Sequence, residues 1–197
     1  GAMYVIMDTT AGEKERRTLE ALLTMPATRT EIVLGKFAIA VLIALLSSVL
    51  AIIGMTAGTV FLAGAIGESA TPSLSIPVGN LLLIGIATLV LAMTSASLEM
   101  LVASFARSFK EAQNLLSPLT MIVIVPAIAM QYMSEQTLRS LAIVPIFNAM
   151  LLIRDALLNR ASAGIIMLEL SSAMVYMVIA LAIAIKIFNS EKAMIRY

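Results

Sequence analysis

Hydrophobic residues fill four long segments of the chain, and charged residues gather between them. Three of the segments hold no charged residue and the fourth is broken only by Glu169; they cover residues 37–67, 69–98, 112–134 and 161–185. An α-helix needs about 20 residues to cross a hydrocarbon core of ~30 Å, and every segment is long enough. The pattern therefore predicts an all-α, multi-pass transmembrane helical bundle. Its four spans are expected at residues 37–64, 77–104, 113–133 and 163–187.

Composition favours the same class of protein. The chain is 60% hydrophobic and 13% charged, far from the balance of an ordinary soluble domain. Its start is not a short apolar stretch with a small-residue cleavage site, so a signal peptide is not expected. Gly1-Ala2-Met3 looks like the scar of a cleaved tag. We therefore expect residues 1–3 to be a tag remnant and residues 4–197 to form a single membrane domain.

The positions of Lys and Arg predict the orientation of the bundle. If the first span leaves the cytoplasm, the stretches 13–36, 107–113 and 186–197 lie inside and carry five, two and three basic residues. The external stretch 135–160 then carries three, and the loop at 68–75 carries none. Positive charge prefers the cytoplasmic side, so this orientation is favoured and predicts a multi-pass protein of the plasma membrane.

Prolines divide two of the apolar stretches. Pro118 and Pro126 fall inside the third span, which we expect to be bent. Residues 135–160 are apolar but broken by Pro145 and Asn148, and they are too short to cross the bilayer twice. A solvated loop would leave their large apolar side chains exposed. An external, re-entrant segment of short helices is therefore predicted.

The stretch before the first span is strongly charged. Residues 13–36 hold five basic and four acidic side chains. A helix is predicted over Glu13–Met25, because Thr9 or Thr10 can cap its start and Pro26 can end it. Three leucines inside it form an apolar patch about one turn long; they are Leu19, Leu22 and Leu23. This amphipathic cytoplasmic helix has two interpretations, an anchor in the lipid headgroups or a docking element for a cytosolic partner.

Two sequences within these stretches resemble a known family. "AGEKERRTLEALLTMPATRTEIVLGK" at residues 11–36 and "LVASFARSFKEAQ" at residues 101–113 are similar to the cytoplasmic segments of ABC-2 type transporter permeases, in particular the sodium-exporter permease subgroup. The resemblance implies that the predicted helix at 13–25 is a coupling helix, which rests in a groove of a separate ATPase subunit. The residues that would dock are Glu13, Glu15, Arg16, Arg17, Leu19, Glu20, Leu22 and Leu23. One departure is visible, because the family pattern leads us to expect glycine where Arg17 stands.

The resemblance also implies a function and partners. The chain would be the permease subunit of an ATP-driven ABC exporter, with Na⁺ as a candidate substrate, and would pair with a second permease copy. ATP and Mg²⁺ would be bound by the partner ATPase and not by this chain. Permeases of this group usually have six spans, and only "YVIMDTTA" at residues 4–11 precedes the charged helix. We therefore expect a truncated or split permease.

The absence of nucleotide-binding and catalytic motifs agrees with ATP hydrolysis by a separate subunit. No G-x-x-x-x-G-K-[ST] phosphate loop occurs, and the sequence contains neither His nor Cys. Intramembrane proteolysis usually needs a Ser–His pair, two aspartates or a metal site, and Asp8 and Asp155 fall on opposite sides of the predicted membrane. We expect no enzymatic activity, no catalytic residue, no metal site and no nucleic-acid partner.

Two carboxylates within the predicted spans leave alternatives open. A carboxylate in a span is costly and often marks an ion or proton path, which makes Glu99 and Glu169 possible substrate-path residues. Either could instead be a structural residue near the membrane surface. The competing functions are an ion-coupled secondary transporter or channel, in which these two glutamates bind the ion, and a membrane scaffold subunit without transport.

Overall fold

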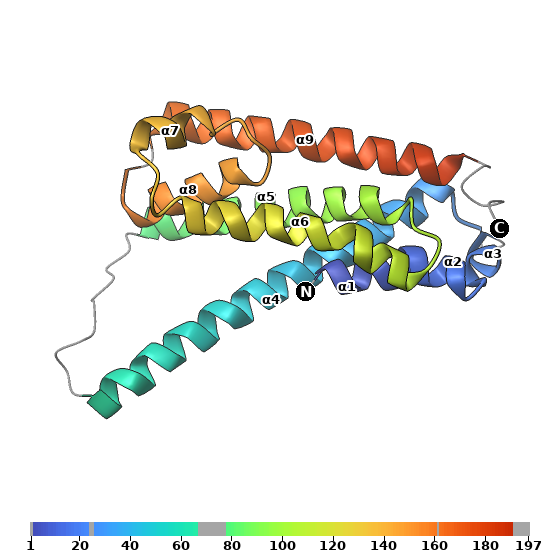
Figure 1. Ribbon diagram of the computed structural model, residues 1–197, viewed down its shortest axis with the longest axis horizontal. Helices are drawn as coiled ribbons and strands as arrows, with labels where there is room; N and C mark the ends of the chain where they lie inside the picture. Colours follow the sequence, from blue (N-terminus) through green and yellow to red (C-terminus); the bar gives the residue numbers. More distant parts are fainter. Residues whose placement is uncertain (1, 24–25, 67–77, 161, 191–197) are drawn as a thin grey trace.

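Four long helices dominate the computed structural model, which describes residues 2–23, 26–66, 78–160 and 162–190 (Figure 1). By length and composition each could cross a membrane. They are α4 (Arg29–Ile66), α5 (Val78–Ala103), α6 (Phe109–Ala129) and α9 (Ala163–Asn189). No strand occurs among the described residues. The predicted all-α fold with four spans is confirmed.

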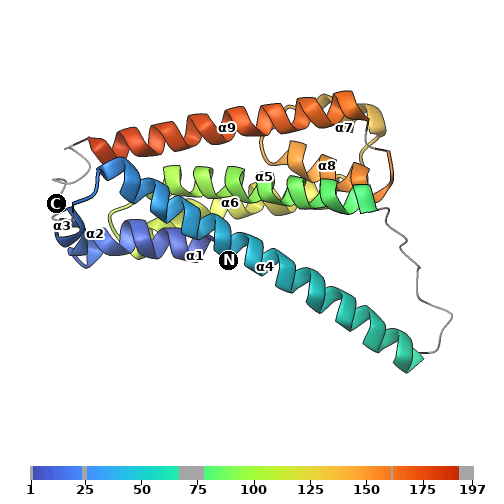
Figure 2. The same ribbon diagram turned by 180° about the vertical axis from the view of Figure 1, so that it is seen from behind.

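Short helices gather at the two ends of this bundle (Figures 1 and 2). One group is α1 (Ala2–Met7), the π-helix η1 (Asp8–Gly12), α2 (Glu13–Glu15) and α3 (Thr18–Leu23). Here α4 and α6 begin and α5 and α9 end. The other group is α7 (Glu135–Ser140) and α8 (Phe147–Leu157), beside the start of α9. The two groups therefore lie at opposite ends of the spans.

Helix α5 forms the centre of the bundle, since it contacts α1, α4, α6, α8 and α9. Its face toward the neighbours is made largely of small residues, including the fully buried Ala87, Ala96 and Ala103. Helix α9 meets it with Ala173 and Ala184, which are also buried. Small side chains let helix backbones approach closely, which is how spans associate where water provides no hydrophobic driving force.

Helix α4 packs on the bundle through its first half alone. Val33, Phe37, Ala40 and Val41 are buried, whereas every described side chain from Val49 onward is exposed. Figures 1 and 2 both show the helix diverging from α5 as it continues.

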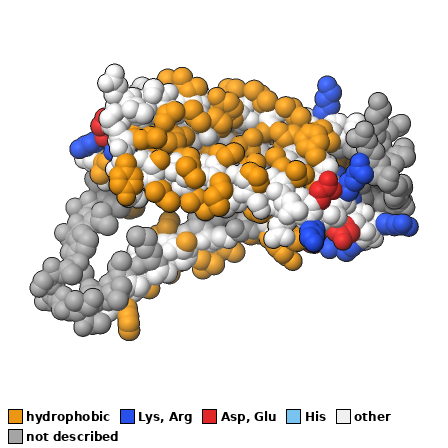
Figure 3. All heavy atoms as spheres, in the orientation of Figure 1, with side chains coloured by type: hydrophobic (Ala, Val, Ile, Leu, Met, Phe, Trp, Pro, Cys, Tyr) orange, Lys and Arg blue, Asp and Glu red, His pale blue; other side chains and the backbone are white. Residues whose placement is uncertain are grey.

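The outer surface has the character expected of a protein within a bilayer. Figure 3 shows hydrophobic side chains over the middle of one face, with Lys, Arg, Asp and Glu confined to its two ends. Exposed apolar residues include Leu46 on α4, Ile122 on α6 and Val178 on α9, each at least half exposed. Such a belt is too large for a soluble monomer and fits a lipid environment.

Two spans begin earlier than their runs of apolar residues. Helix α4 starts at Arg29, where Thr28 and Glu31 form a capping box: Glu31 N donates to Thr28 Oγ1 at 3.3 Å and Thr28 N donates to Glu31 Oε2 at 2.7 Å. Helix α6 starts at Phe109, because the side chain of Ser108 accepts from Glu111 N. Helix α6 also continues through Pro118 and Pro126 to Ala129, so neither proline interrupts it.

The predicted re-entrant segment consists of α7, α8 and the turns around them. Helix α8 packs on α5 and α9, and its Phe147, Leu151 and Leu152 are buried. Ile146, directly before α8, has φ of 71°, an unusual angle for a β-branched residue. The apolar side chains of this segment are therefore covered in large part by the protein itself.

Candidate functional site

Residues 8–23, called the coupling segment below after the role predicted for them, differ from the single helix expected over Glu13–Met25. Helix α1 runs through η1 into α2 without a break, so Thr9 and Thr10 lie inside a helical run and do not cap its start. The chain then turns at Arg16 and Arg17, and α3 covers Thr18–Leu23. Met25 lies outside the described residues. The prediction of one uninterrupted helix was therefore wrong.

The interruption lies where the family resemblance led us to expect glycine. Arg17 has φ of 57°, in the left-handed region that glycine enters without steric cost and other residues enter at about 1–2 kcal/mol. The amide of Arg17 donates to the carbonyl of Lys14 at 3.2 Å, which closes the last turn of α2. The backbone at this position thus has the left-handed geometry that glycine usually adopts at the C-terminal end of a helix, although the residue is arginine.

Two adjacent residues of α2 bind the ends of two spans. Lys14 Nζ donates to the carbonyl oxygens of Ser104 at 2.6 Å and Ala106 at 3.1 Å, just beyond the C-terminus of α5. Glu15 Oε2 accepts from the amide of Phe109, the first residue of α6, at 2.7 Å. A helix carries partial negative charge at its C-terminus and positive charge at its N-terminus, so each side chain meets the end of opposite sign.

Burial changes the pKa of Lys14. Removal of Lys14 from solvent lowers its pKa below the ordinary 10.5, and the nearby charge of Glu111 partly opposes that effect. The positive charge of Lys36 lowers the pKa of Lys14 further. The carbonyl oxygens that Lys14 binds supply hydrogen bonds but no full negative charge, and α2 is therefore held by directed bonds in a partly buried position.

Lys36 has several contacts that the sequence analysis did not predict. It is buried on α4, forms an ion pair with Glu13 and donates to the carbonyl of Thr9 at 2.5 Å. Its ammonium also lies 5.5 Å from the ring centroid of Phe188 on α9, a cation–π distance. One side chain thus connects η1 and α2 to two spans. The sequence feature that could have predicted such a role is the position of this lysine, directly before a long apolar segment.

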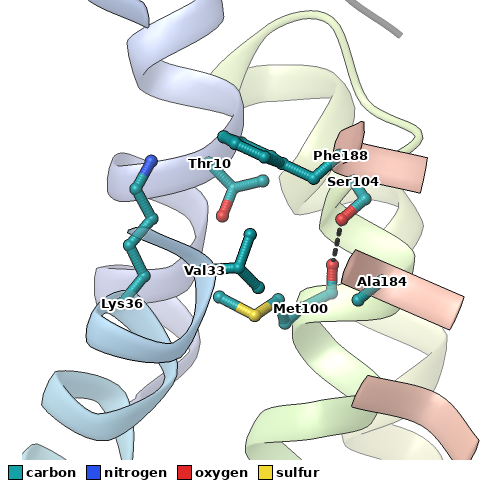
Figure 4. A pocket seen from close by; sticks show the side chains of 7 residues that line it. All are labelled: Thr10, Val33, Lys36, Met100, Ser104, Ala184 and Phe188. Carbon is teal, nitrogen blue, oxygen red and sulfur yellow. Dashed lines mark hydrogen bonds between the residues drawn. The ribbon is translucent and has the colours of Figure 1, made fainter. Parts of the chain in front are cut away.

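A small cavity lies beside Lys36 (Figure 4). It has room for about one water molecule. Its lining comes from η1, α4, α5, α9 and the residue after α5: Thr10, Val33, Lys36, Met100, Ser104, Ala184 and Phe188. The hydroxyl of Thr10 points into this space in Figure 4 and has no hydrogen-bond partner. The junction between the coupling segment and the spans is therefore closely packed.

The remaining predicted docking residues differ in exposure and in contacts. Arg16 is exposed and pairs with Asp8 at 2.8 Å, and Arg17 is also exposed. Leu22 is half-buried. The side chains of Leu19, Glu20 and Leu23 lie outside what the structure describes. Glu13 and Glu15 contact the starts of spans, since Glu13 pairs with Lys36 of α4 and Glu15 accepts from the amide of Phe109 in α6.

The two glutamates proposed for a substrate path lie far apart in the fold. Glu99 is one turn before the end of α5, near the coupling segment, and its buried Oε2 has no hydrogen-bond partner. Glu169 is in the second turn of α9, at the end where α7 and α8 pack, and it is 1% exposed. The structure therefore does not bring them into one site. Among the described residues no group of three or more acidic, His or Cys side chains could hold a metal ion.

Comparison with known proteins places the whole described chain in one class. The model of a family described as "ABC-2 family transporter protein" matches residues 2–193. The ABC transporter permease protein NatB of Bacillus subtilis (strain 168) is 26% identical over 129 residues, which cover 64% of this chain and 32% of that relative. The chain therefore spans about a third of the length of this curated relative. No solved structure matches it.

Proposed function

The chain belongs to the ABC-2 transporter family, and from this premise we propose that it couples ATP hydrolysis by a separate ATPase subunit to export of a substrate. It is a membrane permease subunit of an ABC transporter and a multi-pass protein of the plasma membrane. The family implies an ATPase partner. Two permease copies are proposed, as a homo- or heterodimer, because paired ATPases need paired docking sites.

The observation that carries the proposal is the attachment of α2 to three spans. Lys14 binds the end of α5, Glu15 binds the start of α6, and Glu13 pairs with Lys36 of α4. A displacement of α2 would therefore act on α4, α5 and α6 together. This is the arrangement that a coupling segment requires, since movement of the docked ATPase must reach the spans.

The proposed docking surface is the exposed part of the same segment. Arg16 and Arg17 follow α2 directly and face away from the bundle core, and α3 continues the surface. Lys14 and Glu15 hold the segment to the spans, and the exposed side chains of Arg16 and Arg17 form part of the surface proposed to contact a cytosolic partner. Na⁺ is the proposed substrate, on the resemblance of residues 11–36 to sodium-exporter permeases.

Co-purification with the ATPase encoded beside this chain tests the docking role. We expect capture of the ATPase by the wild type and its loss in Leu19→Asp. The matched control is Leu158→Asp, which places the same charge at a half-exposed leucine beyond α8, at the opposite end of the bundle. Equal capture by all three proteins would contradict the proposed docking surface.

Transport measurements distinguish the exporter from an ion-coupled secondary transporter, for which the buried Glu169 is the favouring observation. In vesicles that contain permease and ATPase, Na⁺ flux should require ATP and stop in a hydrolysis-deficient ATPase. Flux that follows an ion gradient without ATP would favour the secondary transporter.

A further inference from the structure

Helices α8 and α9 carry a group of buried polar side chains. These helices meet, next to α7, at the end of the bundle opposite the coupling segment. Asn148 and Asp155 of α8 and Glu169 of α9 are each no more than 1% exposed. Seven residues separate Asn148 from Asp155, two turns of helix, so both lie on one face of α8. Burial of polar side chains in an apolar region costs free energy unless they form hydrogen bonds, so the contacts of these three residues matter.

Half of the side-chain polar atoms in this group form hydrogen bonds. Asp155 Oδ2 accepts from Arg139 of α7 at 2.6 Å. Asn148 Nδ2 donates to Ser172 Oγ at 2.9 Å and to the carbonyl of Glu169 at 3.4 Å. The carboxyl group of Glu169 is different, because both of its oxygens are buried without a hydrogen-bond partner. Asp155 Oδ1 also lacks a hydrogen bond, although Arg154 Nη1 lies 3.6 Å away.

The surrounding charges do not neutralise Glu169. The charged groups that act on it are Asp155, which repels it, and Arg139, which attracts it and is already bound to Asp155. Helix α5, which packs against α9, carries no charged residue between Val78 and Leu98. On α9 itself the next charged residue is Lys186, almost five turns away. An ionised Glu169 would therefore be a buried charge with no dedicated partner.

A buried carboxylate of this kind has two ways to lower its free energy. It binds a proton, or it binds a small cation together with neighbouring oxygen atoms. The described residues supply two carboxyl groups here and no third, which favours a single positive charge over a divalent ion. The two oxygens of Glu169 are buried without a hydrogen bond and are available for it, whereas Asp155 Oδ1 already lies 3.6 Å from Arg154 Nη1.

We propose that the buried carboxyl group of Glu169 binds one monovalent cation, either H⁺ or Na⁺, between α8 and α9. Arg139 pairs with Asp155 near this site, and Asn148 holds the backbone of α9 beside it. Whether the bound cation is then transported depends on the proposed exporter function. Binding itself does not depend on it, because binding can be measured without the ATPase.

Two measurements on the full chain in lipid nanodiscs test the site. The first follows the melting temperature as NaCl replaces choline chloride at constant ionic strength. The second is infrared spectroscopy of protein labelled isotopically at glutamate, which detects protonated carboxyl groups at neutral pH. Glu169→Gln is the test variant. Glu99→Gln is its matched control, because Glu99 is the other glutamate with a buried, unpartnered oxygen in a span.

Each result supports or overturns the proposal. A rise in melting temperature specific to Na⁺ that Glu169→Gln removes and Glu99→Gln retains identifies the cation as Na⁺. Because Glu99 can contribute to the protonated-glutamate band, the two variants separate the contributions, and a component of that band lost in Glu169→Gln and retained in Glu99→Gln, without the Na⁺ effect, identifies the cation as H⁺. A wild type with neither signal overturns the site, whether or not the variant folds, and so does loss of the signal in Glu99→Gln alone. Failure of ATPase capture would overturn the exporter function and leave this result unchanged.

Discussion

Arg17 shows how one backbone angle can divide a helical segment. The charge pattern over Glu13–Met25 is compatible with one continuous helix, and nothing in the hydrophobic periodicity marks a break. The positive φ of 57° at Arg17 marks it instead. Arginine has good helix propensity, so propensity points the wrong way at this residue. The family pattern, with glycine expected there, carried the information that the single sequence did not.

The strain at Arg17 leads to the first prediction. Arg17→Gly should be more stable than Arg17→Ala by about 1 kcal/mol, because both remove the side chain but only glycine relieves the left-handed backbone. Thermal unfolding of the two variants in the same lipid measures the difference. An alanine variant at least as stable as the glycine variant would show that the angle carries no cost.

Glu135 provides a prediction about pH. A hydrogen bond from Arg154 and its charge, with smaller effects of Arg160 and Arg139, hold the pKa of Glu135 below its ordinary 4.5. Because the folded state binds this proton less readily than the unfolded state, the contribution to stability is present above pH 4.5 and is lost as the pH falls below it. Amide protection factors in α7, which correct for the intrinsic pH dependence of exchange, should fall in acid for the wild type. Glu135→Gln should remove that fall, and an unchanged pH response in the variant would count against the contact.

At the scale of elements, the length of the apolar segments predicted the long helices, and local capping contacts determined where the helices begin. The four spans follow directly from apolar length, and α5 and α9 end within a few residues of their expected bounds. The early start of α4 depends on the Thr28 and Glu31 capping box, which lies in a charged stretch that hydropathy assigns outside the membrane. The contacts of α2 were beyond prediction, because Lys14 reaches residues about 90 positions away.

The attachment of α2 to α5 leads to a prediction for one lysine. Lys14→Met should raise amide exchange in residues 104–109 by about tenfold or more, since a hydrogen bond to a charged group contributes about 1.5–3 kcal/mol. Lys110→Met is the control, because Lys110 is an exposed lysine on the first turn of α6. Exchange that rises equally in both variants would mean that loss of charge, and not loss of the cap, is responsible.

At the scale of the whole molecule, orientation remains a prediction that labelling can test. The sequence contains no cysteine, so each introduced cysteine is unique. In intact cells a membrane-impermeant maleimide should label Gln131→Cys, in the turn after α6, and should not label Arg107→Cys. Both positions are exposed. After the membrane is opened, both should react. Labelling of Arg107→Cys alone in intact cells would reverse the orientation.

The partial packing of α4 has a mechanical consequence. The helix is held by Val33, Phe37 and Val41 near the coupling segment, whereas its described side chains from Val49 to the far end make no buried contact. From Ser48 to Ile66 the rise of ~1.5 Å per residue gives a free arm of roughly 27 Å. A tilt of about 5° at the held end would displace the tip by about 2 Å over that length. Helix α4 would thus act as a lever held near its start, so that a small push on the held end would become a larger excursion at the other end.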